Sequence, residues 1–262
     1  MHIYSFLQAV RDKKPLVHHI TNWVTIYDCA QVVKSLGASP VMAHAPEEAA
    51  AMSGIASALV LNIGTLTTEV IESMKIAGAA ANRKGIPVIL DACGAGATEY
   101  RNRKSLELLD AVKIDVIKGN ASEVASIAGL AVATKGVDVG EVADDLRGVA
   151  KTLSQQRACT VAVTGAEDIV VGQGKMFLVG NGHPMMANVV GTGCMATSVI
   201  GTFAGANPEQ LPEAVAAGLA CYEIAAELAV KKSEGPGSFK QHLFDCVLQL
   251  DEKQIRSLQQ VQ

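Results

Sequence analysis

The sequence predicts an α/β fold in which a central, mainly parallel sheet is covered by helices on both faces. Over the first two thirds of the 262 residues, short runs of β-branched and other apolar residues alternate with longer helical patterns. The last third carries helical patterns and no convincing strand, so we expect a helical C-terminal third packed on the same sheet. No linker, low-complexity tract or repeat divides the chain, which predicts one domain over residues 1–262.

Each predicted strand is a short apolar run bounded by glycine or polar residues, as expected of strands that are buried on both faces. These runs lie at residues 16–20, 40–43, 58–62, 87–91, 116–118, 160–164 and 169–171. The predicted helices between them cover residues 23–36, 46–52, 67–84, 100–109, 121–128 and 139–156. Four further helical segments follow between residues 195 and 258, the first of them at 195–206.

The composition is that of a globular protein and excludes several classes of partner. Apolar residues make up 49% of the chain, and the formal net charge is −4 without a large basic cluster. We therefore expect neither nucleic acid nor an anionic membrane as a partner. The longest apolar run, residues 214–230, is interrupted by Glu223 and Glu227, which predicts a buried helix rather than a membrane span. Six cysteines without CxxC spacing, and no leader pattern at the N-terminus, predict free thiols in the cytoplasm.

Four predicted strands end in loops that place glycine beside a polar residue. These loops contain Gly64 with Thr65, Asp91 with Gly94, Gly119 with Asn120, and Thr164 with Gly165. The carboxyl ends of parallel strands meet at one edge of a sheet, and ligands of such sheets bind there. The sequence therefore predicts a polar site at this edge.

Gly191 and Gly193 flank a threonine directly before the predicted helix at 195–206. Glycines at the start of a helix leave backbone N–H groups uncovered, and with the helix dipole these bind anionic oxygens such as those of a phosphoryl group. Cys194 adds a titratable side chain at the same place, either as a base or as a small residue lining a pocket. The alternative for both glycines is a tight turn or close packing.

Asp91 and Glu123 follow neighbouring strands, so their carboxylates are candidates to hold Mg²⁺ beside a polyphosphate. Asp91 could instead be a polar strand end. Glu123 could instead close a capping box with Asn120, because it stands three positions after that residue. The six histidines show no metal-ligand spacing, so we expect no zinc site.

Other strand ends offer weaker candidates. Lys118 could contact a phosphate as a point charge or be an exposed strand-end lysine. Thr164 and the N–H group of Gly165 could contact a phosphate or form an ordinary turn. Asn22 could bind a small polar ligand or cap the next helix, and Met42 could line an apolar pocket or the core.

The chain closely resembles the hydroxyethylthiazole kinases, which have the ribokinase-like fold, because eight motifs agree with that family in their order and spacing. They lie at residues 17–22 (VHHITN), 37–43 (GASPVMA), 62–66 (NIGTL), 90–98 (LDACGAGAT), 118–123 (KGNASE), 163–165 (VTG), 191–194 (GTGC) and 235–239 (GPGSF). The resemblance covers nearly the whole chain, from about Pro15 to Leu250.

The resemblance implies transfer of the γ-phosphate of ATP, with Mg²⁺, to the hydroxyl of 4-methyl-5-(2-hydroxyethyl)thiazole in thiamine salvage. It also implies a homotrimer with active sites near the subunit interfaces. Cys194 matches the family's cysteine, where most ribokinase-like kinases carry an aspartate base. The implied contacts are Asn22, Met42, Gly64 and Gly191 for the thiazole, Lys118 and Thr164 for ATP, and Asp91 and Glu123 for the metal and phosphates.

Four residues in three motifs depart from the family pattern. His19 stands in place of an asparagine, Ala92 and Cys93 in place of Pro-Val, and Lys118 in place of an arginine whose two-pronged contact a lysine lacks. These departures leave two alternatives open. One is a kinase of another small alcohol, such as the aminopyrimidine of the same pathway, and the other is a non-catalytic thiazole or thiamine binder. An ATP-dependent dehydratase of the same fold is disfavoured by the thiazole-pocket motifs.

Overall fold

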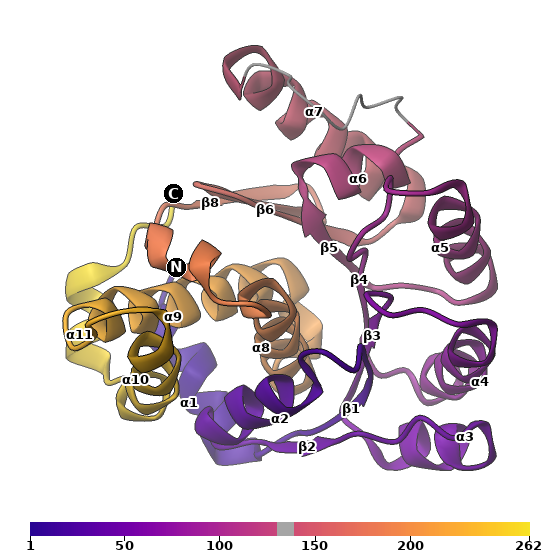
Figure 1. Cartoon of the computed structure of the whole chain (residues 1–262), viewed down its shortest axis with the longest axis horizontal. Coiled ribbons are helices and arrows are strands. Elements are labelled where there is room, and N and C mark those ends of the chain that lie inside the picture. The colour runs from indigo at the N-terminus through magenta and orange to yellow at the C-terminus, as the bar shows by residue number, and fades with distance from the viewer. Residues whose placement is uncertain (130–138) are drawn as a thin grey trace.

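The computed structural model describes residues 1–129 and 139–262, and one eight-stranded sheet runs through the molecule (Figure 1). The strands are β1 (Leu16–Ile20), β2 (Ser39–Val41), β3 (Ala58–Asn62), β4 (Val88–Asp91), β5 (Val116–Asn120), β6 (Thr160–Thr164), β7 (Asp168–Gly172) and β8 (Lys175–Val179). Their order in the sheet is β2-β1-β3-β4-β5-β6-β7-β8. β1 to β6 pair in parallel, and β7 and β8 are added antiparallel. The predicted mainly parallel sheet is therefore confirmed.

β8 is the strand that the sequence analysis did not predict. Met176 to Val179 form a short apolar run that the sequence analysis did not use, and in the structure Lys175 and Met176 are exposed, unlike the residues of a strand buried on both faces. β8 forms at the sheet edge because it pairs with β7 through a hairpin, and Gly174 in that turn has a φ of +76°.

The helices are α1 (Ile3–Lys13), α2 (Ile26–Ser35), α3 (Pro46–Ile55), α4 (Thr68–Lys84), α5 (Glu99–Ala111), α6 (Ala121–Ile127), α7 (Val139–Arg157), α8 (Thr192–Ala206), α9 (Leu211–Val230), α10 (Pro236–Gln249) and α11 (Glu252–Leu258). The predicted helices are present, including the four of the C-terminal third, whereas α1 was not predicted. Within the described residues, no helix is long and apolar enough to cross a membrane.

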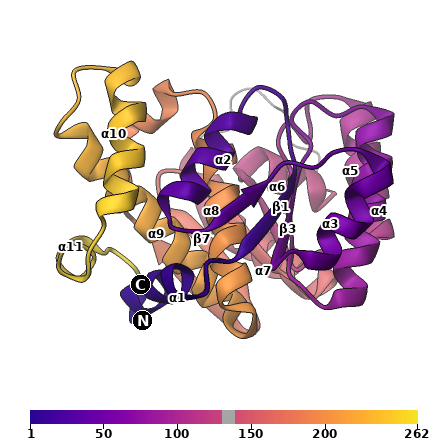
Figure 2. The same ribbon diagram turned by 90° about the horizontal axis from the view of Figure 1, so that it is seen from below.

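The helices form two layers, one on each face of the sheet. Figure 1 shows α3, α4, α5, α6 and α7 on one side, and α1, α2, α8, α9, α10 and α11 on the other. Figure 2 shows from below how α1, α2 and α8 lie beside β1. Two hydrophobic cores fill the two spaces between sheet and helices. The chain passes from β1 to β2 on one side and places β3 on the other, so the direction of strand addition reverses at β1 and β3, and ligands of such sheets bind at the carboxyl ends of strands at this point.

The strand register brings the polar strand ends into one row. Asn62 pairs with Asp91, Asp91 pairs with Lys118, and Asn120 pairs with Thr164. The expectation that these four strands end at one edge of the sheet is confirmed.

α8 lies directly against the sheet at this row. Its residues from Met195 to Ala204 are all buried, which explains why the segment is apolar on every side rather than amphipathic. The close approach depends on Gly201, because a Cβ atom there would lie 2.4 Å from Cγ2 of Val60 in β3. The small residue thus fixes how near the helix start comes to the strand ends.

Replacing Gly201 by alanine should force α8 away from β3. We expect Gly201→Ala to lower the free energy of unfolding by about 1–3 kcal/mol, measured as a lower urea midpoint with an unchanged slope. Gly54→Ala in α3 is the matched control, because a Cβ there meets no atom within 4 Å. That variant should be neutral or more stable by up to about 1 kcal/mol. Equal midpoints for the two variants would contradict the close packing.

Candidate active site

The N-terminus of α8, the predicted anion site, has no side-chain cap. Gly191 precedes the first helical residue with a φ of +95°, and a Cβ there would lie 2.6 Å from Cγ2 of Thr25. No side chain caps the helix, so the N–H groups of its first turn face outward. The helix begins at Thr192, three residues before its predicted start, and Gly193 and Cys194 therefore lie within this turn.

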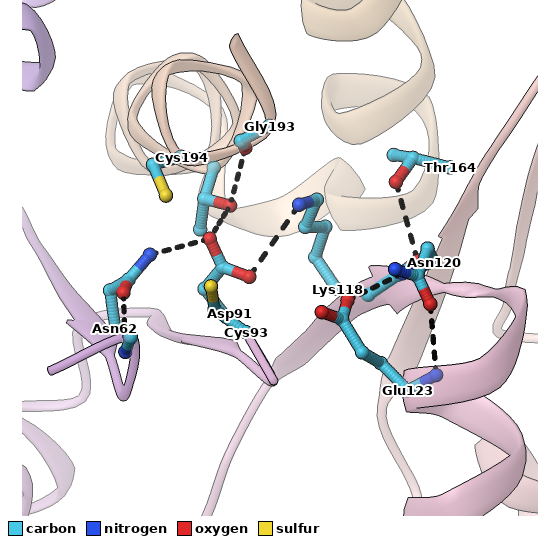
Figure 3. Close-up of polar contacts among 12 residues, drawn as sticks. Asn62, Asp91, Cys93, Lys118, Asn120, Glu123, Thr164, Gly193 and Cys194 are labelled. Atoms are coloured by element: carbon cyan, nitrogen blue, oxygen red, sulfur yellow. Dashed lines mark hydrogen bonds and ion pairs between the residues drawn. The ribbon is translucent and has the colours of Figure 1, made fainter. Parts of the chain in front are cut away.

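The carboxylate of Asp91 lies next to that turn and is buried, with 1% of its surface exposed. Its Oδ2 accepts hydrogen bonds of 2.7 Å each from Nδ2 of Asn62 and Oγ1 of Thr197 (Figure 3). Its Oδ1 lies 3.5 Å from Nζ of Lys118. The sequence analysis named neither Asn62 nor Thr197 as a site residue. Thr197 stands one turn after Cys194 in an apolar helix, and that hydroxyl was the available clue.

Lys118 is buried in β5, so the alternative of an exposed strand-end lysine is wrong. A Cβ on Gly193 would lie 3.3 Å from its Nζ, which places the ammonium group between Asp91 and the start of α8. Burial opposes the charged form, but the charges of Asp91 and Glu123 outweigh it and raise the pKa of Lys118. The lysine therefore adds a permanent positive charge to the anion site.

Glu123 closes the capping box that the sequence analysis kept as an alternative. Its Oε2 accepts the N–H of Asn120 at 2.8 Å, and the Asn120 side chain accepts the N–H of Glu123. The other oxygen, Oε1, accepts the N–H of Gly94 at 2.8 Å. The carboxylate therefore also ties the loop after β4 to the start of α6.

Asp91 and Glu123 are the predicted carboxylate ligands of Mg²⁺. Among the described residues, no group of three or more His, Cys, Asp and Glu side chains is arranged to hold a metal ion. Carboxylate oxygens have further lone pairs beyond the bonds that they accept here. Mg²⁺ is commonly held by one or two carboxylates together with water and substrate phosphates. Asp91 and Glu123 thus fit an ion that arrives with a polyphosphate, rather than a metal cage that exists beforehand.

At the end of β6, one of the two predicted phosphate contacts is bonded within the protein. The N–H of Gly165, predicted as a phosphate contact, instead donates to Oδ1 of Asp168 at 2.9 Å. The hydroxyl of Thr164 donates to the carbonyl of Gly119 at 3.4 Å. Because this long bond is weak, the threonine hydroxyl can exchange it for a ligand, whereas the glycine N–H is engaged at a normal distance.

The thiol of Cys194 is half-buried and accepts a hydrogen bond of 3.4 Å from Nδ2 of Asn22. Its pKa is lowered to about 6, with a hydrogen bond from the Cys93 thiol as the largest cause. Burial and the charge of Asp91 act in the opposite direction, and hydrogen bonds from Thr25 and Asn62 assist the lowering. The lowered pKa favours the thiolate of Cys194, which is the form that accepts a proton.

Asn22, Gly64 and Met42 follow β1, β3 and β2. Asn22 is buried, and its Oδ1 accepts the N–H groups of Val24 and Thr25, so it closes the turn before α2, close to its predicted capping alternative. Oδ1 of Asn62 accepts from Nδ2 of Asn22 and from the N–H of Gly64. Met42 is half-buried beyond the end of β2.

A cavity of about 780 Å³ joins most of the candidate residues. This size is in the range of small-molecule and cofactor sites. Asn22, Met42 and Gly64 are not part of its lining, although Asn22 reaches it through Cys194. The predicted residues that line it are Asp91, Lys118, Glu123, Thr164, Gly191, Gly193 and Cys194.

His19, one of the departures, lies outside this cavity. Its side chain is completely buried, with Nε2 lying 3.2 Å from Oγ of Ser198 in α8. Burial lowers its pKa to about 3, so the ring is uncharged. The histidine packs β1 onto α8 and does not change the lining of the cavity.

An acid pair that the sequence analysis did not identify lines the far part of the cavity. Asp168 and Glu223 are 2% and 7% exposed, and within the described part of the chain Oδ2 of Asp168 and Oε2 of Glu223 have no hydrogen-bond donor. Burial is the largest cause that raises the pKa of both groups, and the neighbouring carboxylate raises that of Glu223 further. We conclude that the pair shares a proton at neutral pH, because two adjacent buried carboxylates repel each other.

Known proteins of similar sequence and of similar structure agree on one family. The sequence profile of the Hydroxyethylthiazole kinase family matches residues 7–253. A hydroxyethylthiazole kinase of Methanosarcina mazei is 51% identical over 98% of this chain and 98% of its own. The structure of a hydroxyethylthiazole kinase protein from Pyrococcus horikoshii OT3 matches with a TM-score of 0.91 and 39% identity over 99% and 98% of the two chains. A ribokinase-like superfamily protein of Enterococcus faecalis V583, 15% identical, shares the fold with a TM-score of 0.63 over 89% and 86%.

The acid pair should make folding stability depend on pH. Unfolded Glu223 ionises near pH 4.5, whereas the folded protein keeps its proton to a much higher pH. Its stabilising contribution is complete below the unfolded pKa and is lost as the pH rises toward the folded pKa. We expect the free energy of unfolding to fall between about pH 5 and pH 8, by at most about 1.4 kcal/mol per unit, and Glu223→Gln to flatten this slope. Urea unfolding at several pH values measures it.

The exposed Glu209 provides the control for this prediction. Glu209→Gln should keep the wild-type slope. A Glu223→Gln slope equal to that of the wild type would show that the pair does not retain a proton.

Proposed function

Since the chain belongs to the hydroxyethylthiazole kinase family, we propose that it transfers the γ-phosphoryl group of ATP to the hydroxyl of 4-methyl-5-(2-hydroxyethyl)thiazole. The observation that carries this proposal is the cavity in which the start of α8, the Lys118 ammonium and the Cys194 thiol meet. A positive field and outward N–H groups suit the equatorial oxygens of a phosphoryl group in transfer. A proton acceptor at the same place suits an alcohol as the attacking group.

In this proposal ATP binds along the β5 and β6 ends. Lys118 contacts a phosphate as a point charge, and the Thr164 hydroxyl provides a neutral contact. Because an ammonium lacks the planar fork of a guanidinium, we expect weaker nucleotide binding than with arginine at this position. Mg²⁺ bound with the nucleotide would neutralise phosphate charge, and Asp91 and Glu123 would hold it through its water ligands.

The thiazole is proposed to bind at the ends of β1, β2 and β3, beside Asn22, Met42, Gly64 and Gly191. Its hydroxyl then faces Cys194 and attacks the γ-phosphorus from the side opposite the leaving diphosphate. The Cys194 thiolate takes the hydroxyl proton. The N–H groups of Thr192 and Gly193 stabilise the negative charge on the phosphoryl oxygens.

We infer that the chain is one kinase domain that acts as a homotrimer in the cytoplasm. One sheet with continuous cores supports the single domain, and six free cysteines suit a reducing compartment. Large apolar side chains, Trp23, Tyr27 and Val190, are 56%, 72% and 72% exposed beside the close contact of Thr25 with Gly191. Such a patch at the edge of the site suits a subunit contact, and light scattering of the purified protein checks the trimer mass.

The first experiment measures release of ADP from ATP and Mg²⁺, with and without hydroxyethylthiazole, and identifies the phosphorylated thiazole by mass. We expect release that depends on the thiazole. Binding of the thiazole without turnover would support the non-catalytic binder instead. Turnover of the aminopyrimidine alcohol in preference to the thiazole would support the other kinase.

Cys194 variants test the proposed base. We expect kcat/KM of the wild type to rise with pH through about 6, because the thiolate is the active form. Cys194→Ala should lose this rise and be slower by about a hundredfold or more. Cys194→Asp should be faster than Cys194→Ala, because a carboxylate can accept the same proton.

Cys246→Ala, in the buried part of α10, is the control and should retain the wild-type profile. A base role for Cys194 is excluded if the aspartate variant is no faster than the alanine variant.

A further inference from the structure

Arg101 lies in the first turn of α5 and reaches two loops of the site at once. Its Nη1 donates to the carbonyl of Ile63 at 2.8 Å and to that of Cys93 at 3.1 Å, and its Nη2 donates to the carbonyl of Gly64 at 2.7 Å. Ile63 and Gly64 follow β3, whereas Cys93 follows β4. One guanidinium group therefore joins the loop at the proposed thiazole end of the site to the loop that follows Asp91.

This bridge lies where the pairing of β3 with β4 ends. Asn62 and Asp91 are the last paired residues of the two strands, and the N–H of Ile63 still donates to the carbonyl of Asp91 at 3.4 Å. Beyond this long bond the two loops lead to different helices, α4 and α5. A guanidinium carries N–H donors on separate nitrogen atoms in one rigid plane, so it can hold both loops where the sheet no longer does.

The position of Arg101 is itself fixed by its surroundings. Its backbone N–H donates to Oγ1 of the N-cap residue Thr98 at 3.2 Å, and its carbonyl accepts from Oγ of Ser105 at 2.7 Å. Gly94 gives the guanidinium room, because a Cβ there would lie 3.0 Å from Nη1, and its φ of +77° also favours glycine. The arginine is half-buried, so its geometry follows from a capped helix and a tight loop.

Both backbone polar groups of Gly64 are already engaged. Its N–H donates to Oδ1 of Asn62 at 2.9 Å, and its carbonyl accepts from Arg101. A Cβ at Gly64 would lie 3.0 Å from Cβ of Asn22 and from Oδ1 of Asn62, so the residue is also closely enclosed. Gly64 therefore offers a ligand the position of its Cα surface rather than a new N–H donor. Because Asn62 also donates to Asp91, this surface is tied to the buried carboxylate.

We propose that Arg101 is a positioning residue, which sets the distance between the Gly64 surface beside the thiazole and the phosphate end of the site at Asp91. The inference rests on the proposed function, because it states a consequence for the binding of the two substrates. The bridge joins the ends of β3 and β4, whereas the proposed ATP contacts Lys118 and Thr164 lie on β5 and β6.

The two substrates should respond differently to loss of the bridge. Thr197 and Lys118 hold the Asp91 carboxylate from α8 and β5, so this group keeps its place without the arginine. The carbonyl of Gly64, in contrast, depends on Nη2 of Arg101. Removing the guanidinium should therefore weaken thiazole binding and slow the transfer, because the hydroxyl is no longer aligned, and should leave ATP binding unchanged.

The test compares Arg101→Met with the wild type by ADP release and by calorimetry with hydroxyethylthiazole alone. Methionine keeps an unbranched side chain and removes every donor. We expect the dissociation constant and KM of the thiazole to rise by about tenfold or more, and kcat to fall by about tenfold to a hundredfold. KM for ATP should stay within about twofold of the wild-type value. Loss of folded protein alone would lower the apparent kcat with both KM values unchanged, and that result would overturn the positioning role.

Two further variants control for charge and for the helix. Arg103→Met changes an exposed arginine of α5, whose guanidinium carbon lies 5.6 Å from the ring centroid of Tyr100, and should keep all wild-type constants. A rise in its thiazole constant equal to that of Arg101→Met would count against the bridge. Arg101→Lys keeps the charge on a single nitrogen and should raise the thiazole dissociation constant by less than Arg101→Met. If the methionine variant does not fold, a wild-type thiazole constant in the lysine variant overturns the proposal.

The wild type separates this inference from the proposed function. Wild-type protein without thiazole-dependent ADP release would overturn the proposed function and the inference with it. Wild-type turnover together with an unchanged thiazole constant in Arg101→Met would overturn the inference alone. An equal rise of KM for ATP and for the thiazole would also overturn it, because the bridge would then not act on the thiazole side.

Discussion

The site depends on the buried carboxylate of Asp91, which joins the carboxyl end of the sheet to α8. Hydrogen bonds from Asn62 and Thr197 and the charge of Lys118 surround it. Taking one charge from such a buried pair leaves the other uncompensated, at a cost of about 3–5 kcal/mol. The same contacts set the distance between the strand ends, where the polyphosphate is proposed to bind, and the helix start. Stability and ligand geometry therefore depend on one group.

α8 can reach that carboxylate because small residues permit close approaches along its length. Gly191 lies against Thr25 before the first turn, and Gly201 lies against Val60 in the middle of the sheet. A larger side chain at either position would move the outward N–H groups relative to Lys118. Packing density in the core thus determines the electrostatic field of the cavity.

The residues that differ from the family pattern affect the cavity in different ways. His19 is buried and uncharged against Ser198, so it affects packing rather than the cavity. Lys118 keeps a positive charge in the anion site but loses the geometry of a guanidinium fork. Cys93 adds a second thiol to the cavity lining and is the largest cause of the lowered pKa of Cys194.

The sequence by itself determined the alternation of strands and helices, seven of the strands, and the row of glycines and polar residues at one sheet edge. These features follow from local periodicity and turn chemistry, which neighbouring residues determine. It did not determine β8, because that edge strand has exposed side chains and exists through pairing with β7. Only the tertiary structure decided between the alternatives at single positions. It buried Lys118, engaged Glu123 in the capping box, assigned the Gly165 N–H to Asp168, and brought Asp168, Glu223, Cys93 and Cys194 into the lining of one cavity. The burial of Lys118 and the meeting of Asp168 with Glu223 depend on segments distant in the chain, about which adjacent residues hold no information. Glu123 and Gly165 have partners only three positions away, so the sequence offered the alternatives and the folded loops decided between them.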